Sequence, residues 1–259
     1  MTSISFSQTR GSGNVKSEDR KTGSFSAVKL SCSADLFISQ GSTSVTVKTD
    51  DNILELVETK VENGTLHIDI KGRGFRSVKV LEVYITMPEL TNLKNSGSGD
   101  IEIKDAFKAS DLVIGLNGSG DLDANLNANN LELRVSGSGD TELTGVRGTF
   151  KVSILGSGDL DAEGLKLENC YIKNSGSGDM ELSGKTNSLD ASNMGSGDVN
   201  GYNLLTVDAV VTNSGSGDVT LNVVEKLNVT LNGSGDLTYR GNPTNVDVRE
   251  RGSGEVYKK

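Results

Sequence analysis

The stretch Gly97-Ser98-Gly99-Asp100 decides the fold, because it recurs along most of the chain. Seven further copies follow it, and a last copy carries glutamate in place of aspartate. The nine acidic residues are Asp100, Asp121, Asp140, Asp159, Asp179, Asp198, Asp218, Asp236 and Glu255. Successive acids are separated by 21, 19, 19, 20, 19, 20, 18 and 19 residues. Such a period is typical of a solenoid, in which each repeat forms one coil.

The residues on both sides of the tetrapeptide alternate between apolar and polar. Ile101 and Ile103 flank a glutamate, and residues 112–116 carry leucine and isoleucine at every second position. This period of two predicts half-buried strands, and Gly-Ser-Gly predicts a tight corner between them. No segment of the repeat carries a helical stripe, so the strands can pair in parallel only by coiling. The sequence predicts an all-β parallel β-helix of nine coils, roughly 40 Å long.

The composition shows no break, and we expect one continuous domain over residues 1–259. Residues 91–259 hold the regular coils, and residues 1–90 form a less regular β region with a cap. Gly11-Ser12-Gly13-Asn14 resembles the repeated corner and predicts a first or capping coil. Asn63-Gly64 predicts a hairpin, and a short helical turn is expected over residues 52–56.

One inward position, two residues before the tetrapeptide, is polar in four coils. Asparagine stands there at Asn95, Asn174, Asn193 and Asn213, whereas four other coils carry leucine, valine or isoleucine. Buried polar side chains need hydrogen-bond partners. The pattern predicts a buried asparagine ladder in which each amide donates to the next.

The composition narrows the classes of partner. The net charge of −9 disfavours a nucleic acid, which requires clustered lysine and arginine. No apolar run is long enough to span a membrane. The chain starts without the basic and apolar segments of a signal peptide, so a cytosolic protein and the mature part of an exported one both stay open. Cys32 and Cys170 are too few for a disulfide framework, and Cys170 falls on the inward column, where a buried free thiol is expected.

The tetrapeptide acid and the residue two positions later are both expected to point outward. Over five coils this gives two columns of carboxylates, roughly 7 Å apart along the strand and about 4.8 Å apart between coils. Neighbouring like charges at that spacing repel by roughly 1 kcal/mol even in bulk water, so something must offset the repulsion. The ten acids are Asp100, Glu102, Asp121, Asp123, Asp140, Glu142, Asp159, Asp161, Asp179 and Glu181.

Two interpretations of this acidic ladder remain open. In the structural one, each corner aspartate accepts hydrogen bonds from the amides and the serine hydroxyl of its own corner. Lys94, Arg134 and Lys173, which lie at outward positions before the corner, would add compensating charge. In the other, the ten acids are the ligands of divalent cations such as Ca²⁺, which takes several carboxylate oxygens at once. No other cofactor is predicted.

Other chemistry has little support in the sequence. His67 is the solitary histidine; its neighbours Leu66 and Ile68 point inward, so it is expected to face solvent. A Ser-His-Asp triad would have to use this residue, and the clusters that bind zinc are missing. The glycine-rich corners lack the lysine of a phosphate-binding loop. No catalytic residue is predicted.

Several stretches together resemble one family. They are residues 20–28 (RKTGSFSAV), residues 35–41 (DLFISQG), Val45-Thr46-Val47, residues 64–68 (GTLHI) and the corner over residues 95–100 with its repeats. In this order they resemble the auto-transporter adhesin head domain called the GIN domain, over most of residues 10–259. The resemblance implies a secreted or surface-exposed β-helical protein of Bacteroidetes-like bacteria, and it supplies no catalytic residues.

The leading functional hypothesis is a non-catalytic extracellular or cell-surface module, an adhesin whose surface ligand is a glycan or a protein. A carbohydrate-active β-helix enzyme, similar to those that degrade pectin, is the first alternative. Such enzymes use clustered acids with a nearby basic residue in a cleft, whereas the acids here form a regular ladder. A cation-stabilised scaffold of the cell envelope is the second alternative.

Overall fold

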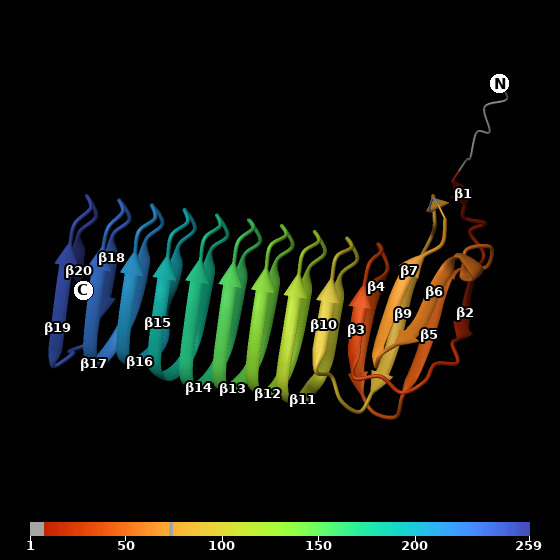
Figure 1. The fold of residues 1–259 in the computed structure, drawn as a ribbon, viewed down its shortest axis with the longest axis horizontal. Helices are drawn as coiled ribbons and strands as arrows, with labels where there is room; N and C mark the ends of the chain where they lie inside the picture. The colour runs from red at the N-terminus through yellow and green to blue at the C-terminus, as the bar shows by residue number, and fades with distance from the viewer. Residues whose placement is uncertain (1–7, 73–74) are drawn as a thin grey trace, which may run out of the picture.

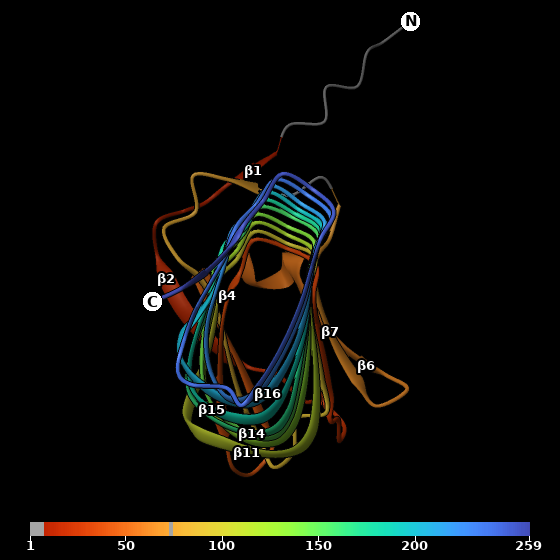
Figure 2. The ribbon, with the colours of Figure 1, turned by 90° about the vertical axis from the view of Figure 1, so that its left-hand side faces the viewer.

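The computed structural model describes residues 8–72 and 75–259. The chain winds into a straight stack of coils whose strands run in parallel from each coil to the next (Figure 1). Viewed along the stack, each coil is a flattened loop, narrow at the corner and broad at the opposite end (Figure 2). The predicted all-β parallel solenoid is confirmed.

Each regular coil consists of a wall before the corner, the corner, a wall after it and a return bend. One long strand covers the wall after a corner, the bend and the wall before the next corner, so register shifts fall at the bends. The strands of these coils are β10 (Asn92–Asn95), β11 (Ile101–Leu116), β12 (Leu122–Val135), β13 (Thr141–Ile154), β14 (Leu160–Asn174), β15 (Met180–Asn193), β16 (Val199–Asn213), β17 (Val219–Leu231), β18 (Leu237–Arg240), β19 (Asn245–Glu250) and β20 (Val256–Lys258).

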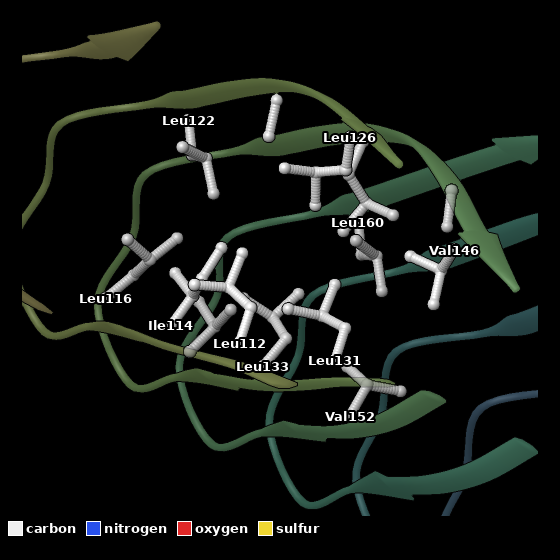
Figure 3. Packing of buried hydrophobic residues seen from close by; sticks show 14 of the residues in the cluster. Leu112, Ile114, Leu116, Leu122, Leu126, Leu131, Leu133, Val146, Val152 and Leu160 are labelled. Atoms are coloured by element: carbon white, nitrogen blue, oxygen red, sulfur yellow. The ribbon is translucent and has the colours of Figure 1, made fainter. Parts of the chain in front are cut away.

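The core is a single strip of apolar side chains between the two walls. Leu112, Ile114 and Leu116 of one wall face Leu122 and Leu126 of the other (Figure 3), and all are at most 2% exposed. The buried residues form one continuous cluster along the described stack. The alternation read from the sequence therefore gives the inward residues of both walls correctly.

The N-terminal third contains a corner that the sequence analysis missed. Residues 32–35 (Cys-Ser-Ala-Asp) stack on Gly97–Asp100, and the strands that flank them pair in parallel with β10 and β11. The elements of this third are β1 (Thr9–Arg10), β2 (Val15–Asp19), β3 (Ala27–Leu30), β4 (Asp35–Gln40), β5 (Ser44–Asp50), the 3₁₀ turn η1 (Leu54–Leu56), β6 (Val57–Glu62), β7 (Thr65–Ile70), β8 (Phe75–Arg76) and β9 (Leu81–Met87).

Order in space differs from order in the chain in this region. β7 pairs with β3, and β9 pairs with β4, so the later strands lie outside the earlier ones (Figure 1). The hairpin predicted at Asn63-Gly64 joins β6 and β7, and both of its turn residues have positive φ. The predicted turn near residues 52–56 is η1.

The prediction of a coil at Gly11–Asn14 is wrong, although the segment does belong to the cap. β2 follows it and pairs antiparallel with β5, so it cannot continue the parallel stack. The segment binds the turn after β5: Gly13 N–H donates to the Asp50 carboxylate at 2.9 Å, and Ser12 Oγ donates to Asp51 at 2.6 Å. Residues 1–7, the first part of the predicted cap, lie outside the described residues.

The inward asparagines are buried as predicted, but their partners are different. Asn193 Nδ2 donates to the carbonyl of Gly197 in its own corner at 3.1 Å and to that of Gly217 in the next corner at 3.2 Å. Its Oδ1 accepts from Gly195 N–H at 3.3 Å. The expected amide-to-amide ladder is wrong, because corner carbonyls of two coils lie within reach of each amide nitrogen and compete for it.

Both cysteines are free and buried. Burial raises the pKa of the Cys170 thiol to about 12, so this thiol stays protonated and unreactive in the folded chain. In the described part of the chain, no helix is long and apolar enough to cross a membrane.

Candidate binding surfaces

The ten predicted acids lie together on the outside of the wall after the corner, and we call this surface the acidic face. The second column is stacked in register, with Glu102 beside Asp123, Asp123 beside Glu142, and Asp161 beside Glu181. The column ends there, because Asn200 and Thr220 take the next positions. Period-two alternation predicted this placement correctly.

The corner aspartates form a hydrogen-bonded ladder from coil to coil. The Oδ1 atom of Asp100 accepts the backbone N–H of Asp121 at 2.9 Å, and the same bond recurs up to Glu255 N–H on Asp236. Nine such bonds, counting Asp35 with Asp100, have lengths of 2.7 to 3.2 Å. The structural interpretation was therefore wrong about the donor, which belongs to the next coil and not to the same corner.

Charge-assisted bonds of this kind offset the repulsion between stacked carboxylates, because each carboxylate lies against an amide dipole. Aspartate suits the position because its short side chain reaches one coil away and no further. In the last corner that the structure describes, the Glu255 carboxylate accepts the Tyr257 hydroxyl at 2.7 Å.

Replacement of Asp159 tests this ladder. Asp159→Ala removes the acceptor of Asp179 N–H, a bond of 2.8 Å, and is expected to lower the free energy of unfolding by about 1 kcal/mol. Asp159→Asn is the matched control, since it keeps a side-chain oxygen and removes one charge from a column of like charges, so its loss should be smaller. Urea unfolding measures both, and equal losses would show that the bond contributes nothing.

Basic residues contribute less to the acidic face than expected. Within the described residues, Lys104 with Glu102 at 3.2 Å is the one ion pair that any of the ten acids forms. Arg134 pairs instead with Glu132 on the wall before the corner, and the expectation that it compensates the ladder is wrong. Lys94 and Lys173 lie on that same opposite wall.

Cation binding by the ten acids stays a prediction. In residues 8–72 and 75–259, no group of three histidine, cysteine, aspartate or glutamate side chains converges as metal ligands. One oxygen of each corner aspartate is also already committed to an amide of the next coil. A cation here would be held by neighbouring carboxylates of adjacent coils and by water.

A second surface, which the sequence analysis did not single out, runs along the corner edge (the upper edge in Figures 1 and 2). A hollow of 1340 Å³ follows the corners from Ser31 to Ser234, and we call it the serine groove. The serines of nine successive corners line it, together with the residue that precedes each of the first eight. Leu155 and Met194 interrupt this row with exposed apolar side chains, 60% and 46% exposed. The serine that recurs in every copy of the tetrapeptide is the sequence signal that could have indicated the serine groove.

His67 lies half-buried on the outer side of β7 between inward Leu66 and Ile68, as predicted. Its register neighbours are Lys29 on β3 and Lys60 on β6. Two lysines beside the histidine are unlike the acid and nucleophile of a hydrolytic triad.

The repeated corner with its aspartate ladder agrees with a known family. The family described as "Putative auto-transporter adhesin, head GIN domain" matches residues 24–182 and 172–243. The chain belongs to this family. As a GIN domain, it also resembles solved structures that share the solenoid over nearly their whole length.

Two of these structures are described as putative adhesins. The one from Parabacteroides distasonis is 21% identical, with a TM-score of 0.77 over 98% of this chain and 100% of that chain. The one from Parabacteroides merdae is 19% identical, with a TM-score of 0.74 over 97% and 99%. A third structure, described as a putative lipid binding protein from Parabacteroides distasonis, is 24% identical, with a TM-score of 0.70 over 98% and 100%. Among curated proteins, none matches the chain.

At these identities the likeness to solved structures shows the fold alone. The family is described as an adhesin, and the solved relatives are described as adhesins or as a lipid binding protein. None of these descriptions assigns a residue of the GIN domain to a ligand.

Proposed function

We propose that this GIN domain is a non-catalytic binding module of the cell surface or of a secreted protein. Its activity is to present a long, rigid, repeated surface to a polymeric partner, a glycan or a protein. Turnover is not part of this role. The family description of an adhesin supports the same class of function.

The unbroken repetition of the corner carries this proposal. Nine corners, from Gly97–Asp100 to Gly252–Glu255, follow one another without an inserted loop, and the corner at Cys32–Asp35 stacks on the first of them. Every outward position therefore becomes a straight column of side chains at a spacing of about 4.8 Å. A polymer meets the same groups repeatedly along such a rod, so weak contacts add up by multivalency.

The enzymatic alternative requires a different arrangement of the same residue types. A polysaccharide lyase or hydrolase needs an acid and a base that converge on one bond in a cleft. The acids of the acidic face stand in open columns, and one oxygen of each corner aspartate accepts a backbone amide. This geometry favours a structural use of the corner acids.

A binding screen combined with a cleavage assay tests the proposed function. The folded chain is applied to arrays of glycans and extracellular matrix proteins, with the heat-unfolded chain as control, and polygalacturonan is assayed for new chain ends. We expect saturable binding by the folded chain alone to at least one polymer class, and no cleavage. Cleavage that Asp159→Asn and Asp179→Asn abolish would establish the enzyme instead. Absence of binding across the arrays would count against the module.

A further inference from the structure

The wall before the corner carries a third surface, separate from the acidic face and the serine groove. A hollow of 520 Å³ lies over β12 to β15, a size typical of small-ligand sites. We call it the basic notch, although two carboxylates also border it. Its polar lining residues are Arg134, Lys151, Ser153, Tyr171, Lys173, Glu132 and Asp190. The register places these residues in adjacent coils: Arg134 beside Ser153, Ser153 beside Lys173, and Lys151 beside Tyr171.

The notch exists because a short side chain lies among long ones. Ser153 is half-buried, whereas Arg134 one coil before it and Lys173 one coil after it are exposed. Lys151 lies two residues earlier on the same strand and therefore on the same face. Ser153 thus lies deeper than the three basic residues that line the hollow with it.

Tyr171 closes one side of the notch with a partly exposed ring. Its exposed fraction is 43%, and Lys151 Nζ lies 5.7 Å from the ring centroid, at the outer limit of a cation–π contact. Within the described residues Arg134 pairs with Glu132, but neither Lys151 nor Lys173 forms an ion pair. Two ammonium groups without a carboxylate partner therefore line the same hollow as an exposed aromatic ring.

We propose that the basic notch binds a sugar residue that carries a single carboxylate within an otherwise neutral glycan. The ring of Tyr171 offers an apolar platform for the C–H face of a sugar. Lys151 and Lys173 supply the charge-assisted hydrogen bonds for its carboxylate, and Ser153 offers a hydroxyl between them. This inference rests on the proposed binding function and names one ligand class and one site for it.

Two carboxylates border the notch in the column of register partners that contains Tyr171, which we call the tyrosine column, and they define the ligand further. Glu132, Lys151, Tyr171 and Asp190 follow one another in successive coils. A densely charged polymer, such as a nucleic acid or a polyuronate, would bring anions against Glu132 and Asp190 as well as against the lysines. A glycan with isolated charges places hydroxyl groups there instead, and these donate to the carboxylates.

Matched oligosaccharides test the notch. Sialyllactose with lactose, and glucuronic-acid-substituted xylo-oligosaccharide with its unsubstituted form, each differ by one acidic sugar. Calorimetry is expected to show that at least one acidic member binds about tenfold more tightly than its neutral counterpart. Tyr171→Ala and Lys173→Gln should each weaken that binding by about tenfold.

Two control variants and two polyanions complete the experiment. Val210→Ala changes an exposed residue of the tyrosine column two coils away, and Lys185→Gln removes an exposed charge outside the notch. Both should bind like the unmodified chain, and all four variants should keep its melting temperature, because their side chains are exposed. Oligogalacturonate and single-stranded DNA are expected to bind more weakly than the singly charged glycans.

Several results would overturn the inference. They are equal affinity for the acidic and neutral members, no binding of any of the four oligosaccharides, unchanged binding by Tyr171→Ala and Lys173→Gln, or tighter binding of either polyanion. Binding of another polymer in the array screen that both variants leave intact would place the binding function elsewhere on the rod. The proposed function itself fails where the whole array is negative, or where the chain cleaves polygalacturonan and Asp159→Asn and Asp179→Asn abolish that cleavage.

Discussion

Gly156→Ala is expected to lower the free energy of unfolding by about 3 kcal/mol or more, because no space exists for a methyl group in a stacked corner. A Cβ atom built on Gly156 would overlap the carbonyl oxygen of Gly137 in the preceding coil. The atom that it meets is backbone, which no side-chain rotation can move aside. This overlap can be relieved only if the two coils move apart, and such a movement stretches the backbone hydrogen bonds between the coils on both walls.

Urea unfolding of Gly156→Ala measures this effect, and Gly23→Ala is the matched control. A Cβ atom on Gly23 meets nothing within 4 Å, so that variant should change the free energy of unfolding by no more than about 0.5 kcal/mol. Similar losses in the two variants would show that the corners relax at little cost. The steric account of the repeat would then be wrong.

The chain itself carries a natural version of this experiment. Cys32 and Ala34 occupy the two glycine positions of the first corner, and both have side chains. The strands that lie beyond this corner, β7 and β9, are joined by residues 71–80, whose sequence does not contain the corner tetrapeptide. The glycine requirement therefore applies where a corner lies directly over another one, and it lapses at the end of the stack.

Sequence alone predicted the regular coils well, because their structure is local and periodic. The spacing of the acids fixes the coil length, and alternation fixes which side chains face inward. Anchors of the return bends such as Phe107, Leu126, Val146 and Leu165 are all buried, as expected. Coil length and the alternation of inward and outward residues define most of a solenoid, since each coil contacts only its neighbours.

The N-terminal third was less predictable because its stacking order departs from chain order. Between Asp35 and Asp100 the chain leaves the stack, forms β5, η1 and the β6–β7 hairpin, and then returns outside β3. The sequence of this segment has no repeat period from which such an excursion could be predicted. The first corner also lacks both glycines, so the motif that identified the others did not identify it.

The hydrogen-bond partners of polar side chains were predicted less well than their positions. Corner aspartates and inward asparagines were placed on the correct sides, but both bond to the backbone of an adjacent coil. Which amide or carbonyl lies nearest depends on the lateral offset between coils, which sequence spacing does not give. The basic notch was not predicted for the same reason. Its residues come from successive coils, and only the register between those coils brings them together.

Asn193→Ala is expected to lower the free energy of unfolding by about 2 to 3 kcal/mol, since it removes a fully buried side chain that ties two corners together. The variant loses the donors to Gly197 and Gly217 and the acceptor for Gly195 N–H. Asn174 still donates to the Gly197 carbonyl and Asn213 to the Gly217 carbonyl, which limits the loss. The variant is left with a small cavity and with a partly buried Gly195 N–H group that has lost its acceptor.

Asn193→Leu separates the cavity from the lost hydrogen bonds, and we expect it to cost only about 1 kcal/mol. Leucine occupies this same inward position at Leu116 and Leu231, where the coil closes normally. Urea unfolding of both variants against the unmodified chain measures the difference. An alanine variant no less stable than the leucine variant would show that the side chain does not act by filling space. If both variants were also as stable as the unmodified chain, the inward asparagine would not hold the corner either. The stack would then depend on its glycines and its apolar strip alone.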